Sequence, residues 1–212
     1  GHIGNVLVRA LLERGERVRA LILPGEDPTP MDGLDVEKVE GDVLDFPALQ
    51  AALQGVKNVF HLAGMISILP GRNPLLRLVN VVGTRNVIHA ARNAGAQRLV
   101  YTSSIHALSR VPHGVRIDED IPFDPEHAIS EYDHSKAQAS LEVQQAVAEG
   151  LDAVLVCPTG VIGPYDFRHS EMGQLIYDCA KQKPQLYVDG AYDFVDVRDV
   201  AQGLIAARDR GR

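Results

Sequence analysis

The chain has 212 residues, of which 45% are hydrophobic and 23% are charged, and its formal net charge is −7. This composition suits one well-packed globular domain, or one domain and part of a second. The acidic balance disfavours nucleic acids and anionic membranes as partners, because both attract basic surfaces, and no apolar run is long enough to cross a bilayer.

Strand and helix patterns alternate along the chain. In chain order, we expect a helix over 5–14, strands over 17–23 and 36–42, a helix between 45 and 55, a strand over 58–64, a helix over 79–94, a strand over 98–104, a helix over 132–149, a strand over 152–158 and a helix that follows residue 199. A glycine follows four of these helices and suits the left-handed conformation that ends a helix: Gly15, Gly55, Gly95 and Gly150. Asp45 is a suitable N-cap for the second helix.

This alternation predicts an α/β fold with a doubly wound parallel sheet of the Rossmann type and helices on both faces. The strands over 58–64, 98–104 and 152–158 are almost continuously apolar, which is typical of buried parallel strands. In such a fold, ligands bind beyond the carboxyl ends of the strands. The residues to consider there are Asp42, 61–64, Ser103, Ser104 and 158–163.

Two groups near this edge can carry proton chemistry. Tyr132 and Lys136 are four residues apart in the segment YDHSK, so a helix presents both side chains on one face. An ammonium group beside a phenol lowers the pKa of the phenol, which can then exchange a proton with a substrate oxygen. Ser104 ends the strand that carries YTSS and can donate a hydrogen bond to a substrate carbonyl.

The segment GHIG opens the first expected helix with Gly1 and Gly4. A glycine-spaced turn before a helix can hold a phosphate, because the free amides at the start of the helix favour an anion. Such turns normally follow a β-strand, and no residue precedes Gly1 in this chain. We therefore expect that the first strand of the fold and the first glycine of the turn are absent from these residues.

Eight segments occur in an order and spacing that are highly specific in combination: GHIG, VEGDVLD, HLAG, NVVGTRNVIHAAR, YTSS, YDHSK, CPTGVIGPYD and FVDVRDVA. Over essentially the whole chain they resemble the extended short-chain dehydrogenase/reductases, also called the NAD-dependent epimerase/dehydratase family. The sequence of the segment CPTGVIGP is more similar to that of the dihydroflavonol-4-reductase-like members than to that of the sugar epimerases.

The resemblance implies a catalytic role for three residues. Tyr132 would be the general acid/base, Lys136 would tune its pKa and bind the cofactor ribose, and Ser104 would orient the substrate carbonyl. Asn80 would be a structural or water-relay residue, with a helix-cap hydrogen bond as an equal alternative.

The resemblance also implies a set of residues that contact the cofactor. They are Gly1, Ile3, Gly4, Asp42, Val43, Leu62, Ala63, Gly64, Tyr132, Lys136, Pro158 and Val161. Asp42 would accept a hydrogen bond from the adenine amino group, and Pro158 and Val161 would flank the nicotinamide. Gly64 stands where the family more often has alanine.

The resemblance divides the chain into residues 1–156, a dinucleotide-binding domain without its first strand, and residues 157–212. The second part would complete that domain and begin a substrate-binding portion. Because that portion of the family continues beyond the last segment of this chain, we expect it to be incomplete here.

The cofactor is expected to be NAD or NADP. A carboxylate after the second strand of the fold favours NAD, whereas an arginine favours the 2′-phosphate of NADP. Here the turn contains Leu23, followed by Glu26 and Asp27, which tilts the expectation towards NAD.

The sequence leaves three functions open. The first is an NAD(P)-dependent oxidoreductase that reduces a ketone or aldehyde, or oxidises the alcohol. The second is a nucleotide-sugar epimerase or dehydratase, and the third is a non-catalytic regulator that binds the dinucleotide. We expect a small-molecule partner and no nucleic acid or membrane; a homodimer is compatible with the sequence.

The remaining polar residues predict no further chemistry. The eight histidines show no metal-ligand spacing, so we expect no metal, and His61 is expected to be a packed strand residue. Cys157 and Cys179 form no CxxC pair, which favours a reducing, cytoplasmic location.

Overall fold

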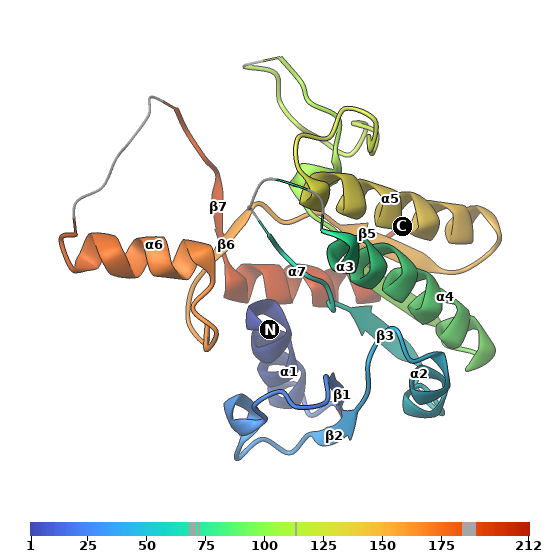
Figure 1. Cartoon of the computed structure of the whole chain (residues 1–212). Coiled ribbons are helices and arrows are strands. Elements are labelled where there is room, and N and C mark those ends of the chain that lie inside the picture. The colour runs from blue at the N-terminus through green and yellow to red at the C-terminus, as the bar shows by residue number, and fades with distance from the viewer. Residues whose placement is uncertain (68–70, 72, 113, 184–189) are drawn as a thin grey trace.

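The computed structural model describes residues 1–67, 71, 73–112, 114–183 and 190–212. All pairs between named strands are parallel. The strands are β1 (Arg19–Ile22), β2 (Glu37–Glu40), β3 (Asn58–His61), β4 (Arg98–Thr102), β5 (Ala153–Val156), β6 (Gly160–Ile162) and β7 (Phe194–Asp196). They form three groups, β1–β2, β3–β4–β5 and β6–β7, in which each strand pairs with the next (Figure 1).

Helices connect these strands in the predicted alternation. They are α1 (His2–Glu13), α2 (Phe46–Ala52), α3 (Pro74–Arg77), α4 (Gly83–Asn93), α5 (Glu131–Ala148), α6 (Glu171–Ala180) and α7 (Val197–Arg210). Three shorter elements are the 3₁₀ turns η1 (Thr29–Met31) and η3 (Ile105–Ala107) and the π-helical turn η2 (Leu78–Val82), which runs directly into α4. None of the helices in the described part of the chain combines the length and the apolar character needed to cross a bilayer.

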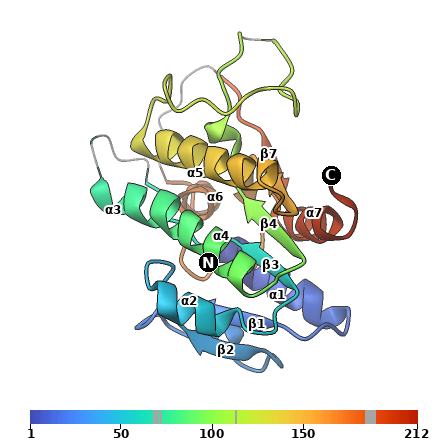
Figure 2. The same ribbon diagram turned by 90° about the vertical axis from the view of Figure 1, so that its right-hand side faces the viewer.

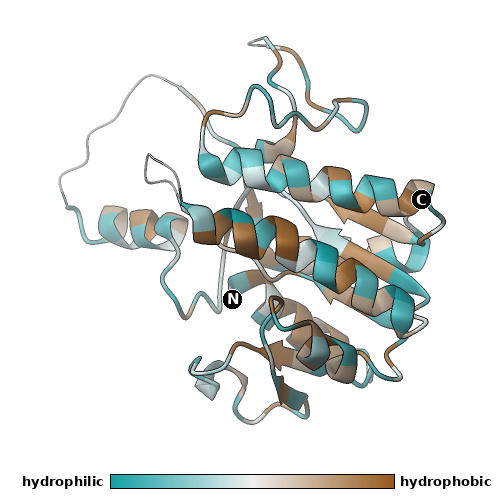
Figure 3. Ribbon diagram, turned by 45° about the vertical axis from the view of Figure 1, so that its right-hand side comes forward, coloured by the Kyte–Doolittle hydropathy of each residue, from teal (hydrophilic) through white to brown (hydrophobic). Residues whose placement is uncertain are grey.

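Two apolar clusters cover opposite faces of the sheet, which confirms the doubly wound arrangement. One cluster joins α2, α4 and α5 to the sheet, and the other joins α1 and α7 (Figure 2). The central strand β4 contributes side chains to both clusters, because successive side chains of a strand point to opposite faces of the sheet. Leu99 and Tyr101 belong to the first cluster, and Val100 belongs to the second. The helices that pack there carry hydrophobic and hydrophilic residues in alternating patches (Figure 3).

The pairing of the sheet is incomplete between β1 and β3. Among the described residues, β1 pairs with β2 alone and β3 pairs with β4 alone, so each has one unpaired edge. By contrast, β4 has a partner on both sides. The expected first strand is not among these residues.

We expect hydrogen exchange to follow this difference in pairing. Amides of β4 should exchange at least about tenfold more slowly than those of β1 and β3, because exchange from β4 requires a larger cooperative opening. Exchange measured by NMR on this chain tests the expectation. Equal protection across the three strands would mean that the edges of β1 and β3 are covered.

The helix ends follow the predicted local signals more closely than the strand ends do. Asp45 caps α2 by accepting from the Ala48 amide, and the four predicted glycines have positive φ between 67° and 94°. All five predicted strands are shorter than expected, because pairing stops before the apolar run does. The last helix begins at Val197, ahead of its expected start, because Asp196 accepts from the Arg198 amide.

One close approach fixes the loop after β2 against the helix layer. A Cβ added to Gly83 would lie 2.6 Å from the Val43 Cγ2 atom, so only glycine allows α4 this close. The Asn86 side chain also donates to the Val43 carbonyl at 2.9 Å. These two contacts place the neighbouring Asp42 at the edge of the sheet.

The substitution Gly83→Ala should therefore lower the free energy of unfolding by about 1–3 kcal/mol through overpacking. Gly203→Ala is the matched control, because a Cβ at that position of α7 meets no atom within 4 Å. It should raise the free energy of unfolding by about 0.5–1 kcal/mol. Urea denaturation of both variants measures the difference, and equal effects would contradict the close approach.

Candidate functional site

The candidate site lies at the carboxyl ends of β3, β4 and β5. Ser104 is two residues after the end of β4, and Tyr132 lies in the first turn of α5, whose start is set by Ser130 accepting from the Asp133 amide at 3.0 Å. The loop after β5 joins this edge, since the Ile105 amide donates to the Pro158 carbonyl at 3.2 Å. The fold thus gathers side chains from distant parts of the sequence at one edge.

Ser104 lies close enough to Tyr132 to influence the pKa of its phenol. Burial raises the pKa of Tyr132 above its ordinary value, and the hydrogen bond with Ser104 opposes that rise. The Ser104 oxygen also accepts from the His106 amide at 3.2 Å. That backbone donor occupies a lone pair of Ser104, so its hydroxyl proton remains available for donation towards Tyr132 or a substrate.

Lys136 contacts different groups from those expected. Its ammonium donates to the Tyr101 hydroxyl at 3.0 Å and to the Thr102 carbonyl at 2.7 Å, in a buried position. The sequence predicted that Lys136 would lower the pKa of Tyr132, but that pKa is raised and Lys136 is not among its causes. The reason is geometric, because both donations of the ammonium turn it towards β4.

Burial lowers the pKa of Lys136 to about 7. The unfolded chain, with the ordinary lysine pKa, therefore binds one more proton than the folded chain between about pH 7 and the ordinary value near 10.5. The contribution of Lys136 to the free energy of unfolding must therefore rise as the pH rises through that window.

We expect the difference in unfolding free energy between the wild type and Lys136→Met to grow with pH. Its slope between pH 7 and 9 should approach about 1.4 kcal/mol per pH unit, because the substitution removes this one titrating group. Urea denaturation at several pH values measures both curves. Parallel curves would show that Lys136 keeps an ordinary pKa in the folded protein.

Asn80 joins the loop after β3 to α5. Its amide accepts from the Met65 backbone N–H at 2.8 Å, and donates to the Met65 carbonyl at 3.0 Å and to the Ser135 hydroxyl at 2.9 Å. Ser135 in turn donates to the Tyr132 carbonyl at 2.8 Å. Asn80 is fully buried on the π-helical turn η2, so it is a structural link and not a helix cap.

This link also explains the glycine at position 64. A Cβ on Gly64 would lie 3.1 Å from the Asn80 side-chain oxygen, which is tighter than an ordinary contact. The smaller residue therefore lets Asn80 approach the loop. Ala63 and Gly64 remain exposed at the end of β3, where a bound molecule can reach them.

His61 is a packed residue of β3. Its Nε2 atom lies 2.9 Å from the Thr84 hydroxyl, and that hydroxyl donates its one proton to the Asn80 carbonyl at 2.6 Å. Nε2 of His61 must therefore be the donor. Burial lowers the pKa of His61 to about 3, so the ring is neutral near neutral pH.

The residues predicted to hold a dinucleotide are arranged compatibly with one. A Cβ on Gly1 or Gly4 would meet no atom within 4 Å, so the space around the first turn of α1 is open for a phosphate. Ile3 lies between them on α1 and packs partly into the α1–α7 core. One oxygen of Asp42 accepts from the Leu44 amide at 2.9 Å, which fixes the carboxylate and leaves its other oxygen for a ligand.

Two buried hydroxyls at the same edge support this fit. Thr102 Oγ1 and Thr159 Oγ1 have no hydrogen-bond partner among the described residues. Thr159 lies between Pro158 and Val161, the pair expected beside the nicotinamide, and Leu62 is half-buried at the end of β3. Buried polar atoms without partners are costly, so polar groups of a bound cofactor would satisfy them.

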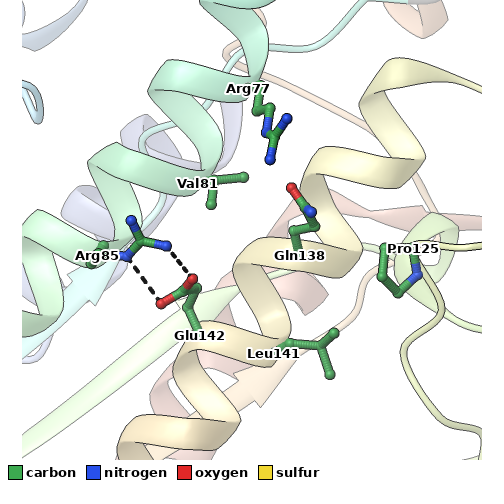
Figure 4. A pocket seen from close by; sticks show the side chains of 7 residues that line it. All are labelled: Arg77, Val81, Arg85, Pro125, Gln138, Leu141 and Glu142. Carbon is green, nitrogen blue, oxygen red and sulfur yellow. Dashed lines mark hydrogen bonds and ion pairs between the residues drawn. The ribbon is translucent and has the colours of Figure 1, made fainter.

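A surface hollow elsewhere contains none of the predicted site residues (Figure 4). It lies between η2–α4 and α5 and is lined by Arg77, Val81, Arg85, Pro125, Gln138, Leu141 and Glu142. Arg85 forms an ion pair with Glu142 across it.

Sequence reasoning missed several groups that shape the site. Tyr101 and Ser135 lie inside the quoted segments YTSS and YDHSK, but only the folded contacts show what they bind. His106 is two residues after Ser104, and its ring packs against that of Tyr132 with centroids 6.2 Å apart. Its position after the strand was the one available signal.

Comparison with known proteins gives a consistent result. The family model described as the NAD dependent epimerase/dehydratase family matches residues 1–212. The chain is 41% identical to sterol demethylase protein B of Methylococcus capsulatus, a match that covers 100% of this chain and 64% of that protein. It is 37% identical to a putative dihydroflavonol 4-reductase of Synechocystis sp., covering 100% of this chain and 62% of that protein.

Solved structures agree with the fold. The crystal structure of gox2253 is 36% identical, with a TM-score of 0.94, and the match covers 100% of this chain and 64% of that chain. The UDP-glucose 4-epimerase of Thermus thermophilus in complex with NAD is 27% identical, with a TM-score of 0.83, covering 98% of this chain and 71% of that chain. The chain thus spans 62–64% of the length of the two curated relatives.

Proposed function

This chain belongs to the NAD-dependent epimerase/dehydratase family, and we propose that the polypeptide carrying it is an oxidoreductase that reduces a ketone or aldehyde, or oxidises the alcohol. The observation that carries the proposal is that α5, which holds Tyr132 and Lys136, is fixed beside the end of β4 and Ser104, because Lys136 donates to the Thr102 carbonyl at 2.7 Å. The similarity to a putative dihydroflavonol 4-reductase supports the same reaction class. In this proposal residues 1–156 hold the dinucleotide, and residues 157–212 complete that domain and begin the substrate-binding portion.

The side chains act on the substrate oxygen. The nicotinamide cofactor, when bound, supplies or accepts the hydride. Ser104 donates a hydrogen bond that orients the carbonyl, and Tyr132 donates its phenolic proton to the oxygen as negative charge develops there. The raised pKa of Tyr132 keeps the phenol protonated near neutral pH, which suits the reductive direction.

Lys136 holds this arrangement in place. Two of its three donor positions bind Tyr101 and Thr102, which leaves the third for a ribose hydroxyl of the cofactor in this proposal. Because Thr102 belongs to β4, these bonds tie α5 to the strand that precedes Ser104.

The proposed cofactor is NAD. The turn after β1 carries Glu26 and Asp27, and the Asp27 carboxylate is held by the Thr29 amide at 3.0 Å. A carboxylate in this turn favours the free 2′-hydroxyl of NAD. Arg168 forms an ion pair with Glu26, and an arginine near this turn favours the 2′-phosphate of NADP. Titrating the natural polypeptide with NAD and with NADP therefore compares the two affinities directly.

The substitution Tyr132→Phe in the natural polypeptide should lower kcat by about 100-fold or more, because it removes only the proton-transfer group. Cofactor affinity, measured by calorimetry, should stay nearly unchanged. The measurement is NAD(P)H oxidation over a panel of ketones, aldehydes and sugar nucleotides.

Tyr177→Phe on α6 is the matched control, since this exposed phenol lies outside the site and should leave turnover intact. Retention of most activity in Tyr132→Phe would contradict the catalytic assignment. Cofactor binding without turnover of any panel member would favour a regulator, and turnover of sugar nucleotides alone would favour an epimerase or dehydratase.

A further inference from the structure

His106 presents a second polar group beside the reacting pair. It lies on η3, two residues after Ser104, and its ring packs edge-on against the Tyr132 ring. Its side chain is 40% exposed, so the imidazole faces the open side of the edge. Nothing in the proposed hydride and proton transfer uses this ring.

The imidazole is held from two sides. Nδ1 lies 3.5 Å from the Asp133 carboxylate, whose side chain is only 13% exposed, and Nε2 lies 2.9 Å from the Tyr192 hydroxyl. The covered carboxylate favours the proton on Nδ1, which leaves Nε2 of a neutral ring as a hydrogen-bond acceptor. Tyr192 must then donate to it. The acceptor therefore faces the solvent side, and the carboxylate that orients it is covered.

Tyr192 is a replaceable partner for that acceptor. Its side chain is 48% exposed, and it comes from the segment before β7. Its ring has room because residue 160 is glycine: a Cβ there would lie 2.5 Å from the Tyr192 Cε1 atom. The hydroxyl of Tyr192 lies near enough to Tyr132 to contribute to the raised pKa of that phenol.

We propose that His106 is a specificity-determining residue whose Nε2 accepts a hydrogen bond from a hydroxyl group on the carbon next to the substrate carbonyl. In the bound state this substrate hydroxyl replaces the Tyr192 hydroxyl. The substrate class is accordingly an α-hydroxy ketone or aldehyde, or the corresponding diol on oxidation. The inference rests on the proposed function, because Ser104 and Tyr132 must hold the carbonyl oxygen for its neighbouring carbon to face His106.

The test compares two ketones that differ by one hydroxyl, 2-hydroxyacetophenone and acetophenone. The natural polypeptide with its cofactor should show a kcat/KM about tenfold higher for the hydroxylated ketone, the worth of one hydrogen bond. His106→Leu should bring this ratio close to one, because it should raise KM for 2-hydroxyacetophenone about tenfold more than KM for acetophenone. His106→Gln, whose amide oxygen can accept in place of Nε2, should restore part of the preference.

Two further variants distinguish the effect of His106 from that of another histidine and from that of Tyr192. His127→Leu is the matched control, since His127 also pairs with a carboxylate, Asp124, at 2.8 Å and its side chain is 82% exposed. It should leave the ratio unchanged. Tyr192→Phe should keep or increase the ratio, because it removes the hydroxyl that competes for Nε2.

Two results would overturn the proposal: an unchanged ratio in His106→Leu, whether or not both ketones are slowed, or a ratio lost in Tyr192→Phe. A binding measurement keeps the two proposals distinct. In cofactor-bound Tyr132→Phe, 2-hydroxyacetophenone should shift the His106 Nε2 resonance in ¹⁵N NMR, and acetophenone should not. That shift without turnover of either ketone by the wild type would retain the subsite and reject carbonyl reduction; its absence would reject the subsite.

Discussion

The buried ammonium of Lys136 is the constraint on which the site depends. A buried amine needs hydrogen bonds to compensate for the lost water, and here Tyr101 and Thr102 supply two of them, although burial still lowers the pKa of Lys136 to about 7. Both belong to β4, the strand that is paired on each side and lies between the two apolar clusters. The most firmly held strand therefore sets the position of α5. Tyr132 follows from it, because one helical turn separates the two residues.

A second set of bonds keeps the neighbouring loop in register with that helix. The Asn80 side chain forms hydrogen bonds with both the backbone amide and the carbonyl of Met65, and donates to Ser135 on α5. It can do so because η2 is a π-helical turn, a feature that widens the helix locally and is frequent at functional sites. The small residue at Gly64 leaves space for the same contact. The loop after β3 and the helix α5 are therefore joined by a continuous set of hydrogen bonds.

The outer side of the site is built differently. Its side chains are exposed, and the elements that carry them come from opposite parts of the sheet: η3 follows β4, while Tyr192 precedes β7. The inner side is buried and hydrogen-bonded at Lys136, Ser135 and Asn80. This contrast fits the two proposals: the buried inner groups would position the reacting atoms, and the exposed outer groups would contact the variable part of a substrate.

The sequence alone determined the fold class, the alternation of elements and the family, because these depend on apolar periodicity, on helix-ending glycines such as Gly95, and on the order of short motifs. It also predicted Ser104 at the carboxyl edge of the sheet, because the ends of parallel strands meet there, and Tyr132 and Lys136 on one face of a helix, because they are four residues apart. The tertiary structure decided where the ammonium of Lys136 points, which is towards Tyr101 and not towards Tyr132. It decided as well that buried Asn80 forms a hydrogen bond with Ser135, and that the His106 ring contacts both Asp133 and Tyr192. These are contacts between residues up to 86 positions apart, and their partners are set by packing of whole elements, which no local pattern in the chain encodes.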